Sequence, residues 1–395
     1  MAFILQTAVY LCSANRKDTL QILLAIFFAL AAVQIIYWIV FLAAFSKKQS
    51  APATGRQLPV SVVICAHDEE ANLKELVPAL MAQDYPEFEI VVVDDRSNDA
   101  TFDWLLEETR KDHRLRMVHV NRTPPHVNGK KYGVTLGIKA AKYEWLLLTD
   151  ADCRPNSRNW ISSMAARFDE PSVSFVLGFS PYIRIPGFLN IFIRFETLLT
   201  AMQYIGLALL GNPFMGVGRN LAYRRSMFLE NKGFNNFLNV TGGDDDLFVN
   251  QHARGKNTRV VVGEESMMYS IPHTRWGAYY TQKTRHLSVG KFYRAKHRFL
   301  LGAFSVTWLL TWFLGLGLLI ALPLQAEPLW IALYSVIGVL VLRTGFISLI
   351  LHITSKKLGQ KFEAWMVPLL DFIYAFYYLV TGLTALVSKE VRWKN

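Results

Sequence analysis

Residues 143–152 read YEWLLLTDAD, and residues 88–95 read FEIVVVDD; both are apolar runs that end in acidic residues. The runs PVSVVICA at 59–66 and RMVHVN at 116–121 complete a set of four strand-like segments. Uninterrupted runs of this kind are typical of strands that are buried on both faces of a parallel sheet. Segments of helical character separate them, at 67–83, 97–112 and 130–142. The alternation predicts an α/β domain with a parallel sheet and helices on both of its faces.

Carboxylates follow these strands. Asp95 closes one run, and Asp150 and Asp152 close another. Ligands of parallel sheets bind beyond the carboxyl ends of the strands, so we expect a binding site here. If the last strand continues, Asp150 and Asp152 project to one face, where they would suit Mg²⁺ or Mn²⁺ bridged to phosphates. A solvated turn with helix-capping aspartates is the alternative.

A second acidic group lies in GGDDDLF at 242–248, with adjacent carboxylates at Asp244, Asp245 and Asp246. Clustered like charges raise the pKa of at least one member, and such a carboxylate can act as general base toward a hydroxyl. The same residues could simply begin a helix, because Leu247 and Phe248 open an amphipathic run. Both interpretations can hold together.

Cations accompany these carboxylates. Lys130 lies in the turn NGKKYG before a helix and can neutralise phosphate there, although a solvated surface lysine is an equal alternative. Gln282, Arg285 and His286 lie in QKTRH and share one side of a helix. The arginine and a protonable histidine could hold a leaving pyrophosphate. The whole basic stretch 276–299 also has the composition of an interfacial helix at anionic headgroups.

Apolar residues make up 52% of the 395 residues, and the excess is local. After an N-terminal segment at 1–18, residues 19–45 form a run long enough for a transmembrane helix. Residues 300–353 predict a transmembrane hairpin, in which Arg343 is expected to face protein. Residues 365–387 form a third C-terminal membrane segment that either spans or re-enters. Lys47 and Arg56 follow the first span and favour a cytoplasmic catalytic domain at an inner membrane.

The net charge of +11 fits anionic lipids or an anionic substrate. Nucleic acid would explain the charge but not the apolar spans, so no nucleic-acid partner is expected. The three cysteines form no CxxC pair, and no structural zinc site is expected. Residues 186–211 are apolar but contain Arg194 and Glu196, which argue against a full span. We expect this segment along the bilayer interface, guiding an acceptor; a buried core helix is the alternative.

The motifs AHDEE, VVVDDRSND, GKKYG, TDAD, GVGRNLAYRR, GGDDDL and QKTRH together resemble membrane-bound family 2 glycosyltransferases with the GT-A fold. The resemblance covers about residues 58–290 and makes 58–275 the catalytic domain. It implies inverting, metal-dependent transfer from a nucleotide-diphosphate-sugar, most readily a UDP-sugar, to a lipid-linked or glycan hydroxyl.

The same resemblance implies roles for individual residues. Asp95 would contact the nucleobase, Lys130 the nucleotide, and Asp244 would be the catalytic base. Asp150 would lie near the ribose and donor and share the metal with Asp152. The remaining residues fall into two groups: Ala66, His67, Glu69, Gln282, Arg285 and His286 on the donor side, and Arg219 and Asn220 on the acceptor side.

Two departures from the family pattern matter. Gly243 stands where the family often has glutamate before the base, which leaves Asp244 and Asp245 as alternatives, with Asp244 favoured. His286 replaces the tryptophan of QxxRW, which removes the aromatic platform associated with polymerising synthases and favours single transfer. A processive polysaccharide synthase remains one alternative. A catalytically inactive membrane scaffold with the same fold is the other.

Overall fold

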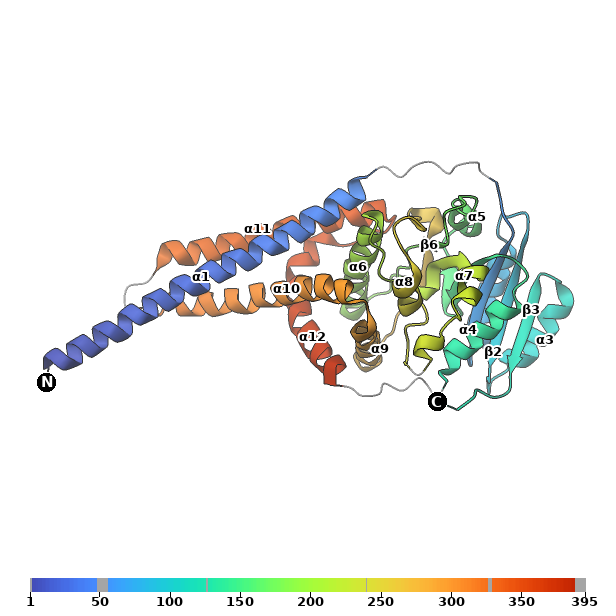
Figure 1. The fold of residues 1–395 in the computed structure, drawn as a ribbon, viewed down its shortest axis with the longest axis horizontal. Helices are drawn as coiled ribbons and strands as arrows, with labels where there is room; N and C mark the ends of the chain where they lie inside the picture. Colours follow the sequence, from blue (N-terminus) through green and yellow to red (C-terminus); the bar gives the residue numbers. More distant parts are fainter. Residues whose placement is uncertain (1, 48–55, 126, 239, 326–328, 388–395) are drawn as a thin grey trace.

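The computed structural model describes residues 2–47, 56–125, 127–238, 240–325 and 329–387, without the side chains of residues 2–17. Figure 1 shows an elongated molecule in which an arm of long helices meets an α/β domain. The core cluster that contains Phe41 and Phe304 of the arm also contains Leu177 and Tyr223 of the domain sheet. Arm and domain therefore share one hydrophobic core.

The main sheet has seven strands in the described residues, in the order β3-β2-β1-β4-β7-β6-β8. Their bounds are β1 Val60–Ala66, β2 Phe88–Asp95, β3 Leu115–Val120, β4 Trp145–Asp150, β6 Phe175–Leu177, β7 Leu221–Arg224 and β8 Thr258–Val260. The four strands expected from the sequence are confirmed and pair in parallel, β1 with β2 and β4, and β2 with β3. The second half differs, because β7 runs antiparallel to both β4 and β6.

Helices cover this sheet and connect its strands (Figure 1). Three follow the expected strands: α2 Glu70–Met81, α3 Thr101–Lys111 and α4 Gly129–Ala140. The shorter ones are α5 Trp160–Ala165, α7 Arg225–Glu230 and α8 Asp246–His252, with 3-10 turns η1 Gly218–Asn220, η2 Asn235–Phe237 and η3 Glu264–Ser266. A small antiparallel sheet pairs β5 Cys153–Pro155 with β9 Met268–Ser270. These elements place the carboxyl ends of β1, β2 and β4 beside one another at one rim.

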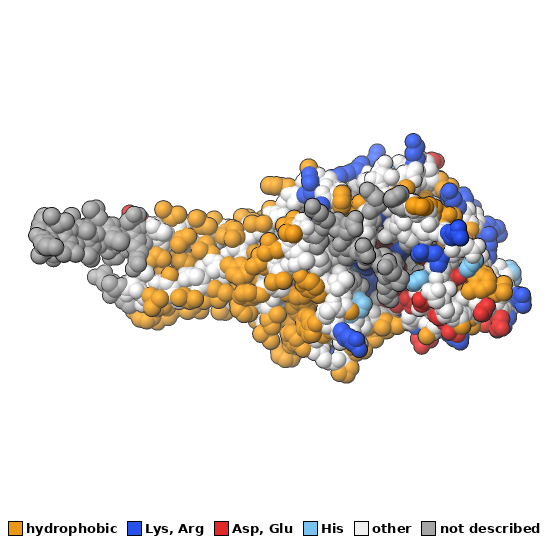
Figure 2. Space-filling model, turned by 90° about the horizontal axis from the view of Figure 1, so that it is seen from below, with side chains coloured by type: hydrophobic (Ala, Val, Ile, Leu, Met, Phe, Trp, Pro, Cys, Tyr) orange, Lys and Arg blue, Asp and Glu red, His pale blue; other side chains and the backbone are white. Residues whose placement is uncertain are grey.

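Three helices form the arm: α1 Ala2–Ser46, α10 Ala295–Ala321 and α11 Trp330–Lys357. Each contains a stretch long and apolar enough to cross a membrane. Figure 2 shows the described arm surface as almost wholly hydrophobic, whereas charged side chains gather on the domain. Two long helices, α10 and α11, occupy the range of the expected hairpin, and the first helix begins well before residue 19.

The last apolar segment is one continuous helix, α12 Val367–Val387, preceded by η5 Ala364–Met366. Pro368 does not interrupt it, because a proline in the first turn removes no intrahelical hydrogen bond. Although α12 is long and apolar enough to span, it runs across the direction of α1, α10 and α11 in Figure 1. If those three helices cross the bilayer, α12 is strongly inclined to them rather than parallel.

The basic stretch 276–299 was expected to form one helix, but the structure divides it. Helix α9 Trp276–Val289 ends in the turn η4 Gly290–Phe292, and α10 begins only at Ala295. Gly290 closes α9 as its C-cap, and the two residues after η4 have extended backbone that redirects the chain into the arm. The basic residues therefore divide between α9, which packs against α12, and the first turns of α10.

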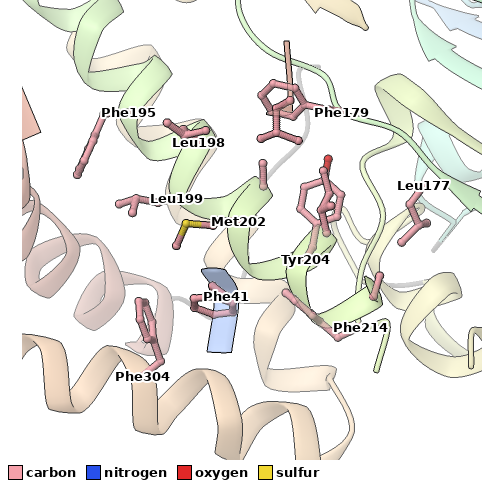
Figure 3. Packing of buried hydrophobic residues seen from close by; sticks show 14 of the residues in the cluster. Phe41, Leu177, Phe179, Phe195, Leu198, Leu199, Met202, Tyr204, Phe214 and Phe304 are labelled. Atoms are coloured by element: carbon pink, nitrogen blue, oxygen red, sulfur yellow. The ribbon is translucent and has the colours of Figure 1, made fainter. Parts of the chain in front are cut away.

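Helix α6 Phe188–Leu209 joins the domain to the arm. It is mostly buried, which favours a core helix over a helix on an open bilayer surface. Figure 3 shows Phe41 of α1 and Phe304 of α10 on the side of α6 that carries Leu199 and Met202. The two charges of α6 are paired, Arg194 with Glu363 at 2.9 Å and Glu196 with Lys283. Pairing permits charges at positions that exclude water.

Inside the arm, Arg343 of α11 lies 2.7 Å from Asp371 of α12, and both side chains are almost completely buried. Trp312 of α10 donates its indole N–H to the same carboxylate oxygen at 2.9 Å. The expectation that Arg343 faces protein is therefore confirmed. Because Nε and Nη2 of Arg343 and Oδ1 of Asp371 have no hydrogen-bond partner among the described residues, the pair itself contributes little net stability.

This arrangement predicts the behaviour of two variants. Asp371→Leu leaves the guanidinium buried without a counter-ion and should reduce the free energy of unfolding by about 3–5 kcal/mol. Arg343→Met combined with Asp371→Leu removes both charges and should restore most of that loss. Thermal unfolding in detergent measures both effects. A double variant that melts no higher than the single one would contradict this account of the pair.

Candidate active site

One cavity of about 1190 Å³ lies at the carboxyl ends of β1, β2 and β4 and extends toward α6, α9, α10 and α12. Nearly every residue singled out in the sequence lines it: Ala66, His67, Glu69, Asp95, Lys130, Asp150, Asp152, Arg219, Asp244, Asp245, Gln282, Arg285 and His286. These residues come from segments that are far apart in the chain. Their convergence is what a shared site requires.

Asn220 is the exception, and its expected place on the acceptor side is wrong. Its side chain is fully buried, and its amide nitrogen donates to the carbonyls of Phe179 and Ser266, both at 2.8 Å. Its amide oxygen accepts from the Trp160 indole at 3.1 Å. Because these bonds occupy both the nitrogen and the oxygen of the side-chain amide, Asn220 connects residues of the core beneath the site. The adjacent Arg219 does line the cavity.

The loops after β1 and β2 form one side of the site. Asp95 is buried and is held by its neighbour Arg96, whose Nε donates to Oδ1 at 2.8 Å. The His67 Nδ1 lies 2.6 Å from the Asp95 carbonyl oxygen. A Cβ at Gly129 would lie 2.7 Å from the Arg96 guanidinium, so only glycine fits there without displacing that side chain. Asp95 is thus pre-oriented at the rim.

Lys130 occupies the centre of the site. Its Nζ lies 2.9 Å from Asp150 and 3.5 Å from Asp244. One ammonium therefore joins the end of β4 to the segment GGDDD at 242–246, called the acidic loop below. Burial alone would lower the pKa of Lys130, but Asp150, Asp244 and Asp245 raise it well above its ordinary value. Lys130 is therefore a permanent cation. The interpretation as a solvated surface lysine is wrong, because its side chain is 19% exposed.

The neighbouring Lys131 has a structural role that the sequence did not indicate. Lys131 is completely buried, and its Nζ donates to the carbonyls of Phe237, at 2.8 Å, and Val240. Burial lowers the pKa of Lys131 to about 8. The two carbonyls immediately precede the acidic loop. Lys131 therefore anchors that loop from below while Lys130 contacts it from the cavity.

Asp150 and Asp152 are the candidate metal ligands. The strand does not continue through them, since β4 ends at Asp150 and Asp152 lies in the turn before β5. Burial and the nearby charge of Asp150 raise the pKa of Asp152, and Arg219 opposes that rise. Two carboxylates that repel each other at a cavity wall suit a divalent cation that takes its other ligands from phosphate oxygens. The described residues contain no group of three such ligands, so the donor would have to complete the coordination.

The acidic loop separates its three carboxylates by environment. Asp245 caps α8: its oxygens accept from the backbone N–H of Asp246 at 2.8 Å and of Gly218 at 2.6 Å. Burial and the charge of Asp244 raise the pKa of Asp245 to about 6. Asp246 is buried and accepts from the Tyr293 hydroxyl at 3.0 Å. Burial and the charge of Asp245 raise its pKa well above its ordinary value.

Asp244 is the carboxylate that faces Lys130. Burial opposes its ionisation, but the Lys130 ammonium and more distant cations outweigh that effect and lower its pKa. It is thus an ionised carboxylate at the cavity. Gly243, in place of the family's glutamate, has a φ of +77°, and a Cβ there would lie 2.8 Å from Leu247. The local backbone therefore accounts for this departure.

Helix α9 supplies the opposite wall through Gln282, Arg285 and His286. Burial and the neighbouring Arg285 and Lys283 lower the pKa of His286 well below its ordinary value. His286 is consequently neutral, and the expectation that it could be protonated to hold pyrophosphate is not supported. It can still donate one hydrogen bond. The positive charge on this wall comes from Arg285 and Lys283.

Tyr182 is a residue that the sequence analysis missed, because it lies in FSPYIRIP, outside every motif. Its ring lies under the Arg219 guanidinium, 4.5 Å from ring centroid to Cζ. Its hydroxyl donates to Gln282 Oε1 at 3.5 Å. Tyr182 therefore links the GVGRN turn to α9 across the cavity, a role that no spacing rule could have indicated.

Comparisons with known proteins show what this chain resembles. The family model Glycosyl transferase family 2 matches residues 61–231. The chain is 22% identical to the probable glycosyltransferase YdaM of Bacillus subtilis in an alignment of 371 positions that covers 86% of each chain. It is 30% identical to the poly-beta-1,6-N-acetyl-D-glucosamine synthase of Staphylococcus epidermidis over 95 residues. That match covers 24% of this chain and 21% of the synthase.

Among solved structures, the mannosyltransferase PcManGT from Pyrobaculum calidifontis, in complex with GDP-Man and Mn²⁺, has a TM-score of 0.60 at 17% identity. The similarity covers 93% of this chain and 100% of that one, and at this identity it establishes the fold alone. Residues 61–231 therefore form a glycosyltransferase family 2 domain, which supports a transferase, and the α/β domain has the GT-A fold that the resemblance implied.

Proposed function

We propose that this protein is a membrane-bound inverting glycosyltransferase. It moves a sugar from a nucleotide-diphosphate-sugar to a hydroxyl of a lipid-linked or glycan acceptor, with the help of a divalent metal. The observation that carries the proposal is that Asp95, Asp150, Asp152 and Asp244 line one cavity together with Lys130, which contacts Asp150 and Asp244. An inactive scaffold would have no use for this set of charged side chains on one cavity.

The donor site follows from the rim of the sheet. Asp95, held by Arg96, is placed to accept hydrogen bonds from a base or ribose. Lys130 lies where a diphosphate would need a fixed cation. Asp150 and Asp152 would hold Mg²⁺ or Mn²⁺, which when bound neutralises phosphate charge as a Lewis acid. UDP-sugars remain the first donors to test. PcManGT, the similar structure, was solved with GDP-Man.

The chemical step uses the ionised Asp244. Its carboxylate removes the proton from the acceptor hydroxyl, and the acceptor oxygen forms a bond to the anomeric carbon. The bond between that carbon and the diphosphate oxygen breaks on the opposite face, so the configuration inverts. Arg285 of α9 stabilises the negative charge that develops on the departing nucleoside diphosphate. Neutral His286 can contribute a hydrogen bond but no charge.

Orientation follows from charges at the domain ends of the arm helices. Lys47 follows α1, and Lys356 and Lys357 lie in the last turn of α11. Lys357 also donates to the Phe45 carbonyl at 2.6 Å, which ties the two helix ends together. Lysines cluster at cytoplasmic helix ends. We place the catalytic domain on the cytoplasmic face of an inner membrane.

Processive polymer synthesis is the second candidate, because 95 residues resemble a poly-beta-1,6-N-acetyl-D-glucosamine synthase. Against it stands His286 at the position where polymerising synthases have tryptophan. Product length separates the two. Single transfer predicts one added sugar per acceptor when membranes receive labelled donor, and a ladder of lengthening products would favour the synthase.

The base can be assigned with two matched variants. Asp244→Asn removes the carboxylate but keeps its shape, and should lower the transfer rate by about 10² to 10⁴. Asp245→Asn retains a competent helix cap and should keep the rate within about tenfold, at a cost of about 1 kcal/mol in stability. Initial rates with labelled donor measure the first effect, and thermal unfolding measures the second.

The pH profile provides an independent check. Because the pKa of Asp244 is lowered, kcat/KM should not fall on the acid side until below about pH 4. If Asp245 were the base, the loss would begin near its pKa of about 6, since protonation abolishes a base. An acid limb near pH 6 that disappears in Asp245→Asn would overturn the assignment to Asp244.

Metal dependence gives the third test. In the wild type, a nucleotide sugar with Mn²⁺ should raise the melting temperature more than the sugar nucleotide alone. Asp152→Asn should abolish this extra stabilisation and lower donor hydrolysis, because one of two candidate ligands is lost. Asp84→Asn is the control, since Asp84 is exposed and pairs with Arg158 on the surface. An unchanged Mn²⁺ effect in Asp152→Asn would remove Asp152 from the metal site.

A further inference from the structure

The active-site cavity does not end at the carboxylates. Beyond α9 it continues between α6, α10 and α12, where its walls are mainly aromatic and aliphatic. Phe304 and Trp308 of α10 face it from one helix, and Tyr374 and Tyr377 of α12 from another. A donor sugar and its nucleotide need polar partners, which lie at the sheet end. The apolar end of the cavity therefore has room for a different molecule.

This apolar end opens to the outside between α10 and α12. Val306 of α10 lines the cavity and is 53% exposed, and Leu383 of α12 lines it and is 55% exposed. Leu386, at the end of α12, lines it and is 69% exposed. Because α10 has the length and hydropathy of a membrane span, apolar side chains exposed beside it face hydrocarbon. The opening therefore leads into the bilayer.

Cations lie near the same opening. Lys291 of η4 and Arg298 in the first turn of α10 both line the cavity. The Lys291 Nζ donates to the Leu386 carbonyl at 3.3 Å, which connects η4 to the end of α12. Residues just before a span lie at the depth of lipid headgroups, where basic side chains attract anionic groups. A charged head and an apolar tail are thus accommodated in one continuous space.

We infer that the acceptor is a membrane lipid that enters sideways between α10 and α12. Its hydroxyl-bearing head reaches Asp244, and its hydrocarbon chain remains in the opening lined by Val306 and Leu383. This inference rests on the proposed function. The chemical step is the same as the one proposed above. The lipid oxygen bonds to the anomeric carbon, its proton passes to Asp244, and the nucleoside diphosphate departs. The product is a glycolipid.

Two glycines offer a direct test of this path. Gly302 of α10 and Gly382 of α12 both line the cavity, and a Cβ at either position meets no atom within 4 Å. The Cβ of a phenylalanine at either position therefore has room, and its ring should narrow the passage. Gly317→Phe is the matched control, because Gly317 lies on the same helix α10, has the same open space and does not line the cavity.

The experiment uses the full-length protein in vesicles made from the total lipid of the producing cells, with labelled UDP- and GDP-sugars. Each variant is tested for donor binding, by thermal shift with Mn²⁺, and for label in the organic phase. Gly302→Phe and Gly382→Phe should bind donor normally but lose at least tenfold in lipid labelling, whereas Gly317→Phe retains both. Normal lipid labelling in the two cavity variants would overturn the inference. So would label that enters only a water-soluble glycan.

A second measurement does not depend on activity. Lipid that co-purifies with the wild type should be detected by mass spectrometry of organic extracts, and its amount should fall in Gly302→Phe but not in Gly317→Phe. Equal lipid in all three proteins would contradict the lateral path. A wild type that neither binds nor hydrolyses any nucleotide sugar would instead contradict the proposed function, which keeps the two failures distinct.

Discussion

The site depends on one partly buried ammonium. Lys130 lies between Asp150, at the end of β4, and Asp244, in the loop before α8. Without this cation, the carboxylates of the strand ends and of the acidic loop would repel one another across a space that excludes much of the solvent. Its neighbour Lys131 restrains the same loop through the Phe237 and Val240 carbonyls. Two adjacent lysines thus position the acidic loop, one through charge and one through hydrogen bonds.

The local surroundings give the three consecutive aspartates 244–246 different roles. A sequence of three carboxylates gives each the same intrinsic chemistry, and only the surroundings distinguish them. Asp245 is committed to two backbone N–H groups, and Asp246 to Tyr293. Asp244 is left beside Lys130, ionised and on the cavity wall. Asp244 is therefore the one of the three carboxylates that can contact a substrate.

The parallel half of the sheet and most of the candidate site could be predicted from the sequence. The features that could not be predicted lack a local sequence pattern. The four parallel strands follow from uninterrupted apolar runs, and Asp95 and Asp150 follow from the ends of those runs. The short strands β6, β7 and β8 have three or four residues each, too few for a periodic signal. Asn220 matched a motif, but its amide is used by the core. Tyr182 and Lys131 matter through partners that are distant in sequence, which no local pattern records.

The direction of α12 shows why composition alone could not settle the membrane arrangement. By length and hydropathy it equals a span, yet it lies across α1, α10 and α11. Asp371 explains part of this difference: its pairing with Arg343 and Trp312 fixes the start of α12 against the arm. The rest of α12 then packs along α9, the helix that carries Gln282 and Arg285. A helix that is apolar enough for hydrocarbon is thereby held against the wall of the active site. One cavity therefore continues from the carboxylates to the apolar helices α10 and α12, which is the geometry that the proposed lipid acceptor requires.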